Sequence, residues 1–434
     1  MTSNAAVFAA DYKNSPYWWE AAPRPRLAES SLPAQADVAV VGSGYTGLCA
    51  AIETARGGRS TLVLDAEDAG WGCSTRNGGQ VSTSFKPSFE ELAALHGRER
   101  AFAILKEGHT ALDWIDQYIA AEKIDCGFAR VGRFHAAHNP AQYEALARRL
   151  QNQPKGLEVE CHMVPRGEQR SELGSDVYFG GAVFARHASL DPALYHQGLL
   201  DRAMAAGAAV HPRTPVSAID GAPGSFRLTT PRGAVQAREV IVATNGYTGG
   251  LTPWLRRRVI PIGSYIIATE ALAPDLMKRL MPRNRVVSDT RKLVYYYRAS
   301  PDQRRILFGG RVAYKETDPK VSAPRLHQEL ARLFPELKDT KVSHSWMGFV
   351  AYTFDTMPHI GKRDGLHYAM GYCGSGVSLA SYFGMRLGRQ VLGLNDGATP
   401  LDGLSFPGRP YYWGNPWFLA PAIRYYRWHD QQNR

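Results

Sequence analysis

The chain has 434 residues, of which 44% are hydrophobic and 21% charged, and its formal net charge is +11. The length predicts two domains, or one with a large insertion, and the composition is that of an ordinary soluble globular protein. Lys and Arg are spread along the chain, which argues against nucleic-acid binding. This even spread of charge favours a basic face that is simply solvated. Binding of an acidic partner, an anionic substrate or a membrane surface is the alternative.

The cysteines and the N-terminus indicate in which cellular compartment the protein is expected. The five cysteines are odd in number, widely spaced and without a C-x-x-C pair, so neither a disulfide framework nor a zinc site is predicted. The N-terminus shows no positive-then-apolar signal pattern, and no uncharged run approaches the roughly 20 residues of a membrane span. We therefore expect a cytoplasmic protein without an integral membrane segment.

Residues 1–36 are expected to form an irregular lead-in, because they contain four prolines. Its Tyr17-Trp18-Trp19 cluster is expected to pack on the body of the protein. A buried parallel strand, Val38–Val41, then runs into a glycine turn and a helix, Leu48–Arg56. A second strand, Thr61–Asp65, ends in an acid 18 residues after the turn.

The spacing Gly42-x-Gly44-x-x-Gly47 predicts a dinucleotide site. Gly42 permits the tight turn, Gly44 leaves room for a pyrophosphate, and Gly47 lets the helix pack against the strand. Asp65 is placed to accept hydrogen bonds from an adenosine ribose. A surface turn with three chance glycines is the alternative, and the strand, helix and acid in this order argue against it.

The next elements alternate between helices and strands. A loop at 70–80 is followed by helices at 88–96 and 99–121 and by strands at 131–137 and 182–185. A helix at 192–206 has Asp191 as its N-cap and Pro192 at its first position. Strands are predicted near 210–219 and at 226–230, and the apolar run 239–246 predicts another buried parallel strand.

From Val259 the pattern changes to long aromatic strands at 263–269, 293–298, 306–312 and 341–354, with helices at 275–280 and 325–333 between them. A late strand, 366–371, ends in a second glycine turn and a helix to about Leu392. We therefore expect a nucleotide domain at 37–90, 180–255 and 355–395. A substrate domain is expected at 91–179 and 256–354, and a tail at 396–434.

Two observations distinguish FAD from NAD. The sequence contains no second G-x-G-x-x-G, so it has no independent NAD domain. The turn Gly374-Ser375-Gly376, about 330 residues after the first, opens a helix whose N-terminus would stabilise the negative charge of a reduced flavin. The sequence favours FAD.

The order of six motifs resembles the D-amino-acid oxidase superfamily, and within it the γ-glutamylputrescine oxidoreductase group. The motifs are GSGYTG at 42–47, GWGCSTRNGGQ at 70–80, ATNGYT at 243–248, LFGGR at 307–311, WMG at 346–348 with DTMPHIG at 355–361, and GYCGSG at 371–376. The resemblance covers nearly the whole chain. It implies an α/β fold, with a Rossmann-like FAD-binding domain and an antiparallel β-sheet plus helices as the substrate domain.

The resemblance also implies cofactor contacts. The first turn and Asp65 would hold the ADP half of FAD, and the loop at 74–80 would run beside the pyrophosphate, with Arg76 as a counter-charge or, alternatively, in a surface salt bridge. The expected cofactor residues are Gly42, Gly44, Tyr45, Thr46, Gly47, Asp65, Ser74, Arg76, Asn77, Gly78, Gly79, Gln80, Val216, Thr244, Asn245, Gly246, Gly374, Ser375, Gly376 and Val377.

The chemistry implied is oxidation of a small-molecule amine by hydride transfer to the flavin, with hydrolysis of the imine and reduction of O2 to H2O2. Tyr295 and Tyr297 share a strand face, and Tyr297, Trp346 and Arg311 are the expected catalytic residues, with core aromatics as the alternative for each ring. Arg311 is expected to have a ligand or a carboxylate partner.

Two departures from sarcosine-oxidase relatives limit these expectations. Leu307 stands where those relatives carry a lysine that promotes reaction with oxygen, so a dehydrogenase passing electrons to a quinone or protein is the alternative. Val350 and Ala351 stand where a cysteine attaches their flavin, so non-covalent FAD is expected, with Cys73 and Cys373 the remaining candidates for a bond. A binding protein without catalytic activity is the third hypothesis. The amine and the oligomeric state stay open.

Overall fold

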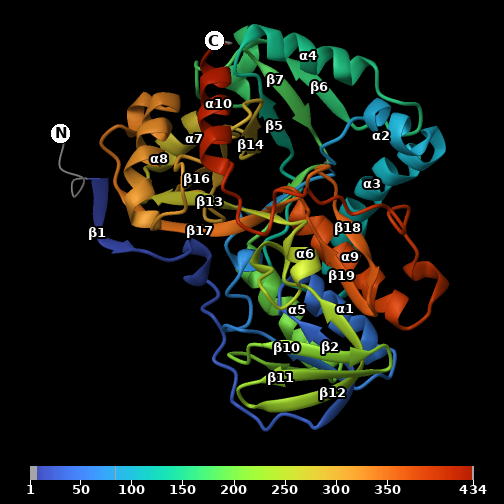
Figure 1. The fold of residues 1–434 in the computed structure, drawn as a ribbon. Coiled ribbons are helices and arrows are strands. Elements are labelled where there is room, and N and C mark those ends of the chain that lie inside the picture. Colours follow the sequence, from blue (N-terminus) through green and yellow to red (C-terminus); the bar gives the residue numbers. More distant parts are fainter. Residues whose placement is uncertain (1–6, 84, 433–434) are drawn as a thin grey trace.

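The computed structural model describes residues 7–83 and 85–432 and consists of a nine-stranded sheet, an eight-stranded sheet and a small two-stranded sheet with helices around them (Figure 1). The strands are β1 Phe8–Lys13, β2 Gln35–Val41, β3 Thr61–Leu64, β4 Gln80–Val81, β5 Arg133–Ala136, β6 Cys161–Val164, β7 Gly181–Phe184, β8 Ala188–Ser189, β9 Ala209–His211, β10 Ala218–Ala222, β11 Ser225–Thr230, β12 Gly233–Val242, β13 Ile260–Thr269, β14 Val286–Asp289, β15 Tyr296–Ala299, β16 Ile306–Gly310, β17 Val342–Tyr352, β18 His359–Arg363 and β19 Leu366–Met370. The helices are α1 Tyr45–Arg56, α2 Phe89–His96, α3 Arg98–Ala121, α4 Pro140–Gln151, α5 Pro192–Ala205, α6 Pro253–Arg256, α7 Pro274–Leu280, α8 Pro319–Leu333, α9 Gly376–Val391 and α10 Leu419–Gln432.

The lower sheet in Figure 1 is the nucleotide-binding half. β2 lies between β3 and β12, β9 follows β3, β19 follows β12, and all these pairs are parallel. Both faces are covered, which is why these strands read as continuous apolar runs. One core packs the sheet against α1, α5 and α9, and a second lies on the opposite face with Leu255 and Phe406.

The upper, nine-stranded sheet has the order β1-β17-β13-β16-β15-β14-β5-β7-β6. Its outer face packs against α7 and α8 in a core that contains Tyr297, Phe308 and Phe334. Its inner face turns toward the nucleotide half, where Ile266, Leu307 and Trp346 pack with Trp18. Because side chains alternate along a strand, neighbouring residues of β15 face different halves of the molecule.

Two helices and one strand pack in a different half of the molecule from the domain that we expected for them. Residues 91–121 were assigned to the substrate domain, yet α2 and α3 pack in the same core as α1 and α9. β7 was assigned to the nucleotide domain, yet it pairs with β5 and β6 in the nine-stranded sheet. The apolar faces of these segments find their partners through tertiary packing, which local periodicity does not reveal.

The two ends of the chain contain more regular structure than expected. β1 pairs with β17 within the lead-in that we predicted to be irregular. All four prolines follow this strand, so they restrict only the chain from Pro16 onward. Residues 1–6 lie outside the described residues. The tail contains α10, which was not predicted, and α4, β6, β14 and β18 were not predicted either.

Candidate active site

The first glycine turn forms the expected tight cradle. Gly42 has φ +105°, and a Cβ there would lie 2.9 Å from the carbonyl oxygen of Ala243. A Cβ on Gly47 would lie 1.9 Å from the carbonyl oxygen of Gly42, so helix and turn are in direct contact. The N-cap of α1 is Gly44, which has no side chain to cap the helix, and the Tyr45 amide donates to Ser74 Oγ at 3.0 Å. The remaining first-turn amides are available to an anion.

Asp65 is bound to this turn. Its Oδ2 accepts hydrogen bonds from the Ser43 amide at 2.7 Å and from Ser43 Oγ at 2.6 Å, and its Oδ1 accepts one from the Glu67 amide at 3.0 Å. Burial raises the pKa of the carboxyl, against these hydrogen bonds, which lower it. The Ala66 backbone also bonds to this carboxyl, so the protein itself already supplies about as many donors as a carboxylate accepts. The ribose contact stays a prediction.

Asn77 holds the loop at 74–80 in shape. Its Nδ2 donates to the carbonyls of Cys73 and Ser74, and its Oδ1 accepts the Gly79 amide at 2.9 Å. Gly79 has φ +63°, and a Cβ there would lie 2.2 Å from the carbonyl oxygen of Leu190. Gln80 Nε2 donates to the carbonyls of Val287 and Tyr297, which ties the loop to the nine-stranded sheet.

Arg76 is partly buried against aromatic rings and carbonyl groups. Its guanidinium lies 4.4 Å from the Trp71 ring centroid and 4.8 Å from that of Trp19. Nε donates to the Trp71 carbonyl and Nη1 to that of Met347 on β17. Burial lowers the pKa of this group. Through these contacts Arg76 ties the loop at 70–80 to β17. The role of Arg76 as a counter-charge to the pyrophosphate stays a prediction.

The second glycine turn lies beside the first. The Tyr372 hydroxyl and Thr46 Oγ1 are 2.6 Å apart, and Asn245 Oδ1 accepts the Gly371 amide at 2.9 Å. Gly374 has φ +94°, and Ser375 begins α9 without a side-chain cap. Two uncapped helix starts, far apart in the sequence, thus meet at one place.

The other expected cofactor residues lie around these turns. Thr244 Oγ1 is hydrogen bonded to Thr248 Oγ1 at 2.8 Å. A Cβ on Gly246 would lie 2.9 Å from the Phe349 carbonyl oxygen, so this turn packs on β17. Val377 is buried in the first turn of α9, and Val216 lies between β9 and β10, partly buried.

Two of the three expected catalytic residues are buried aromatic side chains. Tyr297 is fully buried on the outer face, and its hydroxyl donates to the Tyr178 hydroxyl at 3.4 Å. Trp346 is 1% exposed, and its Nε1 donates to the Arg76 carbonyl at 2.8 Å, so it supports the cofactor loop. Both rings are buried, so their contact with substrate stays a prediction; for Tyr297, alternation along the strand shows which residues share a face but not which face is covered.

Tyr296 faces the cofactor loop instead. A Cβ on Gly78 would lie 3.1 Å from its ring, and its hydroxyl is 2.7 Å from Ser264 Oγ. Tyr352 stands near the second turn, where a Cβ on Gly374 would lie 3.9 Å from its hydroxyl. Burial raises the pKa of Tyr352 to about 12, so this phenol is neutral at pH 7. Tyr296 and Tyr352 thus lie next to the cofactor loops, as do Tyr247 beside Gly72 and Tyr372 beside Thr46.

Arg311 has the carboxylate partner that we expected, but only on one side. It is 8% exposed, and its Nη1 donates to the Gly263 carbonyl at 2.6 Å and to both Glu316 oxygens at 2.8 and 2.9 Å. Nε and Nη2 are buried without a partner among the described residues. These two groups form one edge of the guanidinium, which matches a carboxylate with two parallel hydrogen bonds. Arg311 borders a cavity of about 380 Å³ with Arg291, Tyr295, Arg325, Glu329, Arg332, Arg427 and Asp430 among its walls.

A second group of basic residues was not predicted. Arg133 and His135 point to the inner face of β5, and His135 Nδ1 is 2.9 Å from Ser288 Oγ. Burial, and then the Arg133 and Arg149 charges, lower the pKa of His135 to about 3. Burial, then Arg133, also lower the pKa of Lys86.

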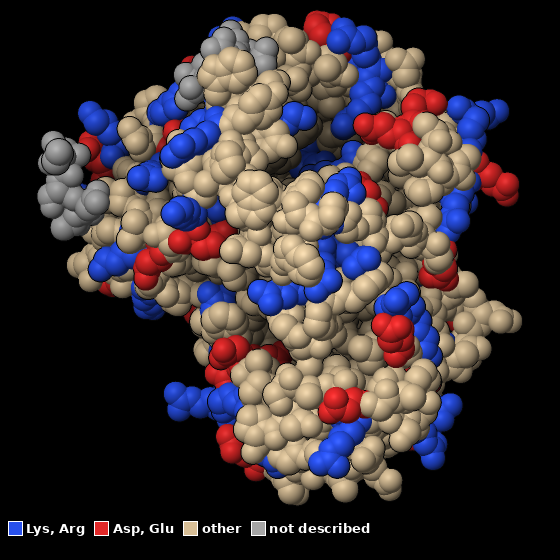
Figure 2. Space-filling view, viewed as in Figure 1, with Lys and Arg blue, Asp and Glu red and all other residues tan. Residues whose placement is uncertain are grey.

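The side chains of Lys86 and Arg149 are exposed to solvent, yet the surrounding protein atoms lower the pKa of both groups by burial. Side chains that line a hollow combine these two properties. Figure 2 shows a hollow in the upper half of the molecule with Lys and Arg atoms in its wall. Three separate segments supply these basic residues, so no single sequence motif predicts them. No group of three or more His, Cys, Asp or Glu that could hold a metal is found in residues 7–83 and 85–432. Within the same residues, no helix is long and apolar enough to cross a membrane.

The fold and the two helix starts are those of a dinucleotide-binding protein with a second, nine-stranded sheet. The chain belongs to the DAO family of FAD-dependent oxidoreductases, whose model matches residues 37–390. It is 31% identical to the gamma-glutamylputrescine oxidoreductase of Escherichia coli K12, over 86% of this chain and 88% of that protein. It is also 31% identical to a probable oxidoreductase OrdL of Rhizobium meliloti, over 91% and 92%.

Solved structures show the same fold. Glycine oxidase from Geobacillus kaustophilus superposes with a TM-score of 0.70 at 18% identity, covering 88% of this chain and 99% of that one. L-proline dehydrogenase from P. horikoshii superposes with a TM-score of 0.69 at 17% identity, covering 90% and 99%. The expected family, fold class and FAD dependence are confirmed. The glycine cradle at Gly42–Gly47 and the uncapped N-termini of α1 and α9 fit FAD.

FAD is expected to be released by acid precipitation, with the yellow colour in the supernatant. Burial raises the pKa of Cys73 and of Cys373 to about 11, so both thiols stay protonated and unreactive at pH 7. Absorbance of pellet and supernatant at the flavin band measures the partition. Cys73→Ala and Cys373→Ala should release the same amount. Colour that stays in the wild-type pellet and leaves it in one variant would show a covalent bond.

Proposed function

We propose that this protein oxidises an amine that carries a carboxylate, such as a γ-glutamylated diamine or a secondary amino acid. The observation that carries the proposal is the group of basic side chains, Lys86, Arg133 and Arg149, on the cofactor side of the nine-stranded sheet, where a carboxylate would find opposite charge. Similarity to a gamma-glutamylputrescine oxidoreductase supports the same class of substrate. When bound, FAD supplies the two-electron acceptor for a hydride from the carbon next to the amine nitrogen.

The basic residues would also prepare the amine. Lys86, Arg133 and Arg149 crowd positive charge at the inner face. Like charges lower the pKa of a bound ammonium, and only the neutral amine has the lone pair that must assist loss of hydride. His135 is neutral at pH 7 because its pKa is about 3. Loss of the hydride from the neutral amine leaves an iminium ion, which gives the imine on losing a proton, and water hydrolyses it to a carbonyl compound and an amine or ammonia.

We propose O2 as the electron acceptor, reduced to H2O2 with two protons, and a quinone or protein as the second candidate. Leu307 favours the second candidate, since it is 2% exposed and packs with Trp18 and Trp346 where a cationic residue is the expected oxygen promoter. Peroxide yield compared with reduction of a quinone-like dye, at equal substrate, separates the two.

Anaerobic reduction of the flavin tests the substrate class. Each carboxylate-bearing amine is paired with a counterpart that lacks the carboxylate: γ-glutamylputrescine with putrescine, and N-methylglycine with dimethylamine. We expect bleaching with at least one carboxylate-bearing member and much slower bleaching with its counterpart. Equal rates for the pairs would remove the carboxylate from the proposal. No bleaching with any amine would overturn it.

Tyr296→Phe is expected to lower kcat/KM about three- to tenfold, while Tyr297→Phe leaves it unchanged. The first variant loses the Ser264 hydrogen bond beside the cofactor loop, and one hydrogen bond contributes about 0.5–1.5 kcal/mol. The second loses only a long bond to Tyr178 in the outer core, which affects stability. Steady-state kinetics and thermal unfolding of both variants measure this. A kinetic defect confined to Tyr297→Phe would contradict the assignment of the faces.

A further inference from the structure

A basic and aromatic surface lies where α6 meets the chain between α9 and α10, at the centre of the face seen in Figure 2. We call it the Arg–Trp surface, and its members are Arg257, Arg258, Arg409, Tyr411, Trp413 and Trp417. Trp413 and Trp417 are each 63% exposed. The proposed reaction does not use these residues, and large exposed aromatics mark an interaction site.

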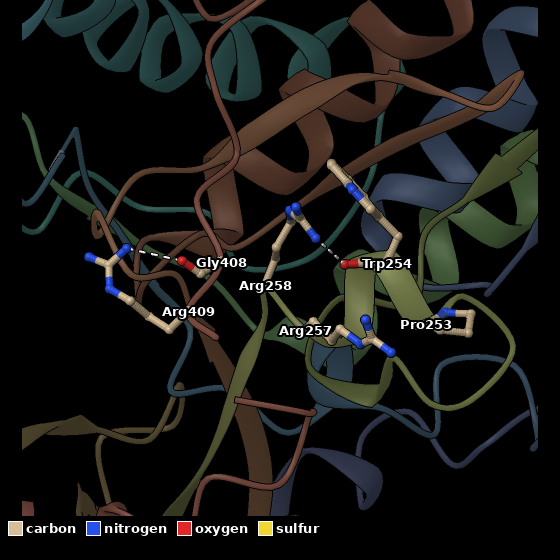
Figure 3. A pocket seen from close by; sticks show the side chains of 6 residues that line it. All are labelled: Pro253, Trp254, Arg257, Arg258, Gly408 and Arg409. Carbon is tan, nitrogen blue, oxygen red and sulfur yellow. Dashed lines mark hydrogen bonds between the residues drawn. The ribbon is translucent and has the colours of Figure 1, made fainter. Parts of the chain in front are cut away.

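An arginine-lined cavity of about 440 Å³ opens in this surface (Figure 3). Arg258 is fixed in its wall, since Nε donates to the Phe406 carbonyl at 2.8 Å and Nη1 to the Trp254 carbonyl at 2.9 Å. Its guanidinium lies 3.8 Å from the Trp254 ring centroid. Arg257 and Arg409 project from the two chain segments on either side. Three arginines thus line the cavity with their guanidinium groups pointing in different directions, and two of them are bonded to backbone carbonyls, Arg258 as above and Arg409 through Nη1 to Gly408 at 3.1 Å.

No acidic residue balances these charges. The sequence contains no Asp or Glu from 403 to 429 or from 249 to 269. Among the described residues, no carboxylate forms an ion pair with any of the three cavity arginines. Burial lowers the pKa of Arg258, and the neighbouring Arg363 and Arg257 lower it further. An anion bound here would relieve this repulsion.

The aromatic members extend the cavity into an amphipathic rim. Arg257 lies 4.1 Å from the Trp413 ring centroid. Trp417 Nε1 donates to the Tyr411 carbonyl at 3.4 Å, and its ring is packed edge-on against Phe418. Trp and Tyr combine an apolar ring with a polar group, and at membrane surfaces they lie at the level of the lipid headgroups.

We propose that the Arg–Trp surface docks the protein on a membrane containing anionic lipid. A lipid phosphate would occupy the arginine-lined cavity, and Trp413 and Trp417 would enter the headgroup layer. Charge complementarity argues for this occupant, because phosphate matches arginine and each Lys or Arg near an anionic membrane adds to binding. The proposal is independent of the substrate, since it concerns a surface outside the active site.

Vesicle co-flotation of the flavin-loaded protein tests it. We expect binding to phosphatidylcholine vesicles that contain phosphatidylglycerol, little binding to phosphatidylcholine alone, and weaker binding as salt rises. Arg257→Glu with Arg409→Glu should lower the partition coefficient roughly twentyfold or more. Trp413→Ser with Trp417→Ser should lower it as well. The controls are Arg59→Glu with Arg304→Glu, which change net charge equally, and Leu95→Ser with Val321→Ser, which remove exposed apolar side chains elsewhere.

Each outcome decides the proposal. Flavin content and thermal unfolding confirm that the variants are folded. Loss of binding in the Arg–Trp variants but not in the controls supports it. Equal binding to both vesicle types, an equal loss in the charge controls, or no binding to anionic vesicles overturns it. In the last case an acidic protein partner becomes the occupant to test.

Discussion

Gly47→Ala is expected to abolish FAD binding and to lower the free energy of unfolding by about 3 kcal/mol or more. The new Cβ would lie 1.9 Å from the Gly42 carbonyl oxygen and 3.2 Å from Val40 Cγ1. Both obstacles belong to β2 and its turn, which the parallel sheet holds in place, so α1 must move away. That movement opens the cradle in which the helix N-terminus meets the pyrophosphate. The flavin-to-protein absorbance ratio and thermal unfolding measure the two effects.

Gly58→Ala is the matched control. Gly58 also has a positive φ, +77°, but a Cβ there meets nothing within 4 Å. It should cost only about 1–2 kcal/mol of backbone strain and leave the flavin content unchanged. A Gly47→Ala protein that keeps its full flavin complement would show that the contact between turn and helix does not shape the cofactor site.

If the unpartnered edge of Arg311 binds the substrate carboxylate, Arg311→Lys is expected to lower kcat/KM for a carboxylate-bearing amine by about 30- to 150-fold, while FAD stays bound. Lysine keeps the positive charge beside Glu316 but lacks the two parallel N–H groups that match a carboxylate. Loss of such a bidentate, charge-assisted pair corresponds to about 2–3 kcal/mol. Steady-state kinetics of both members of each substrate pair measure the effect, which should be confined to the member with the carboxylate.

Arg332→Lys is the control for this variant. Arg332 borders the same cavity, but it is about half exposed and paired with Glu329 in an i, i+3 salt bridge. Exposed pairs of this kind contribute little, so kcat/KM should change less than about twofold. Equal losses in both arginine variants would show a general effect of the cavity charge. An unchanged Arg311→Lys enzyme would contradict the proposed anchor.

Local patterns predicted the nucleotide half well. The buried strands β2 and β12 read as continuous apolar runs, and Asp191 with Pro192 predicted the start of α5, where Asp191 Oδ1 accepts the amides of Ala193 and Leu194. These signals are local, because each cap or run is contained within a few residues. β1 gave no such signal, since it is a short edge strand whose partner β17 lies more than 300 residues away in the sequence.

The substrate side of the site was predictable only in part. Tyr295 and Tyr297 were correctly placed on one face of a strand, but α8 covers that face and Tyr296 turns toward the cofactor loop. A ligand or a carboxylate partner was predicted for Arg311, and the structure shows that Glu316, five residues later, is the carboxylate. The free edge of the guanidinium was not predictable, because it depends on which neighbours fail to reach it.

The sequence by itself determined the cofactor, since the spacing of Gly42, Gly44 and Gly47 expresses a steric requirement that only glycine meets. The second turn at Gly374 needed the tertiary structure only to bring it beside Thr46. Tertiary structure alone decided which face of the nine-stranded sheet meets the flavin site and which basic side chains gather there. The physical reason is that side-chain alternation has two equivalent phases, and only the packing of α8 and the loop at 74–80 on opposite faces distinguishes them.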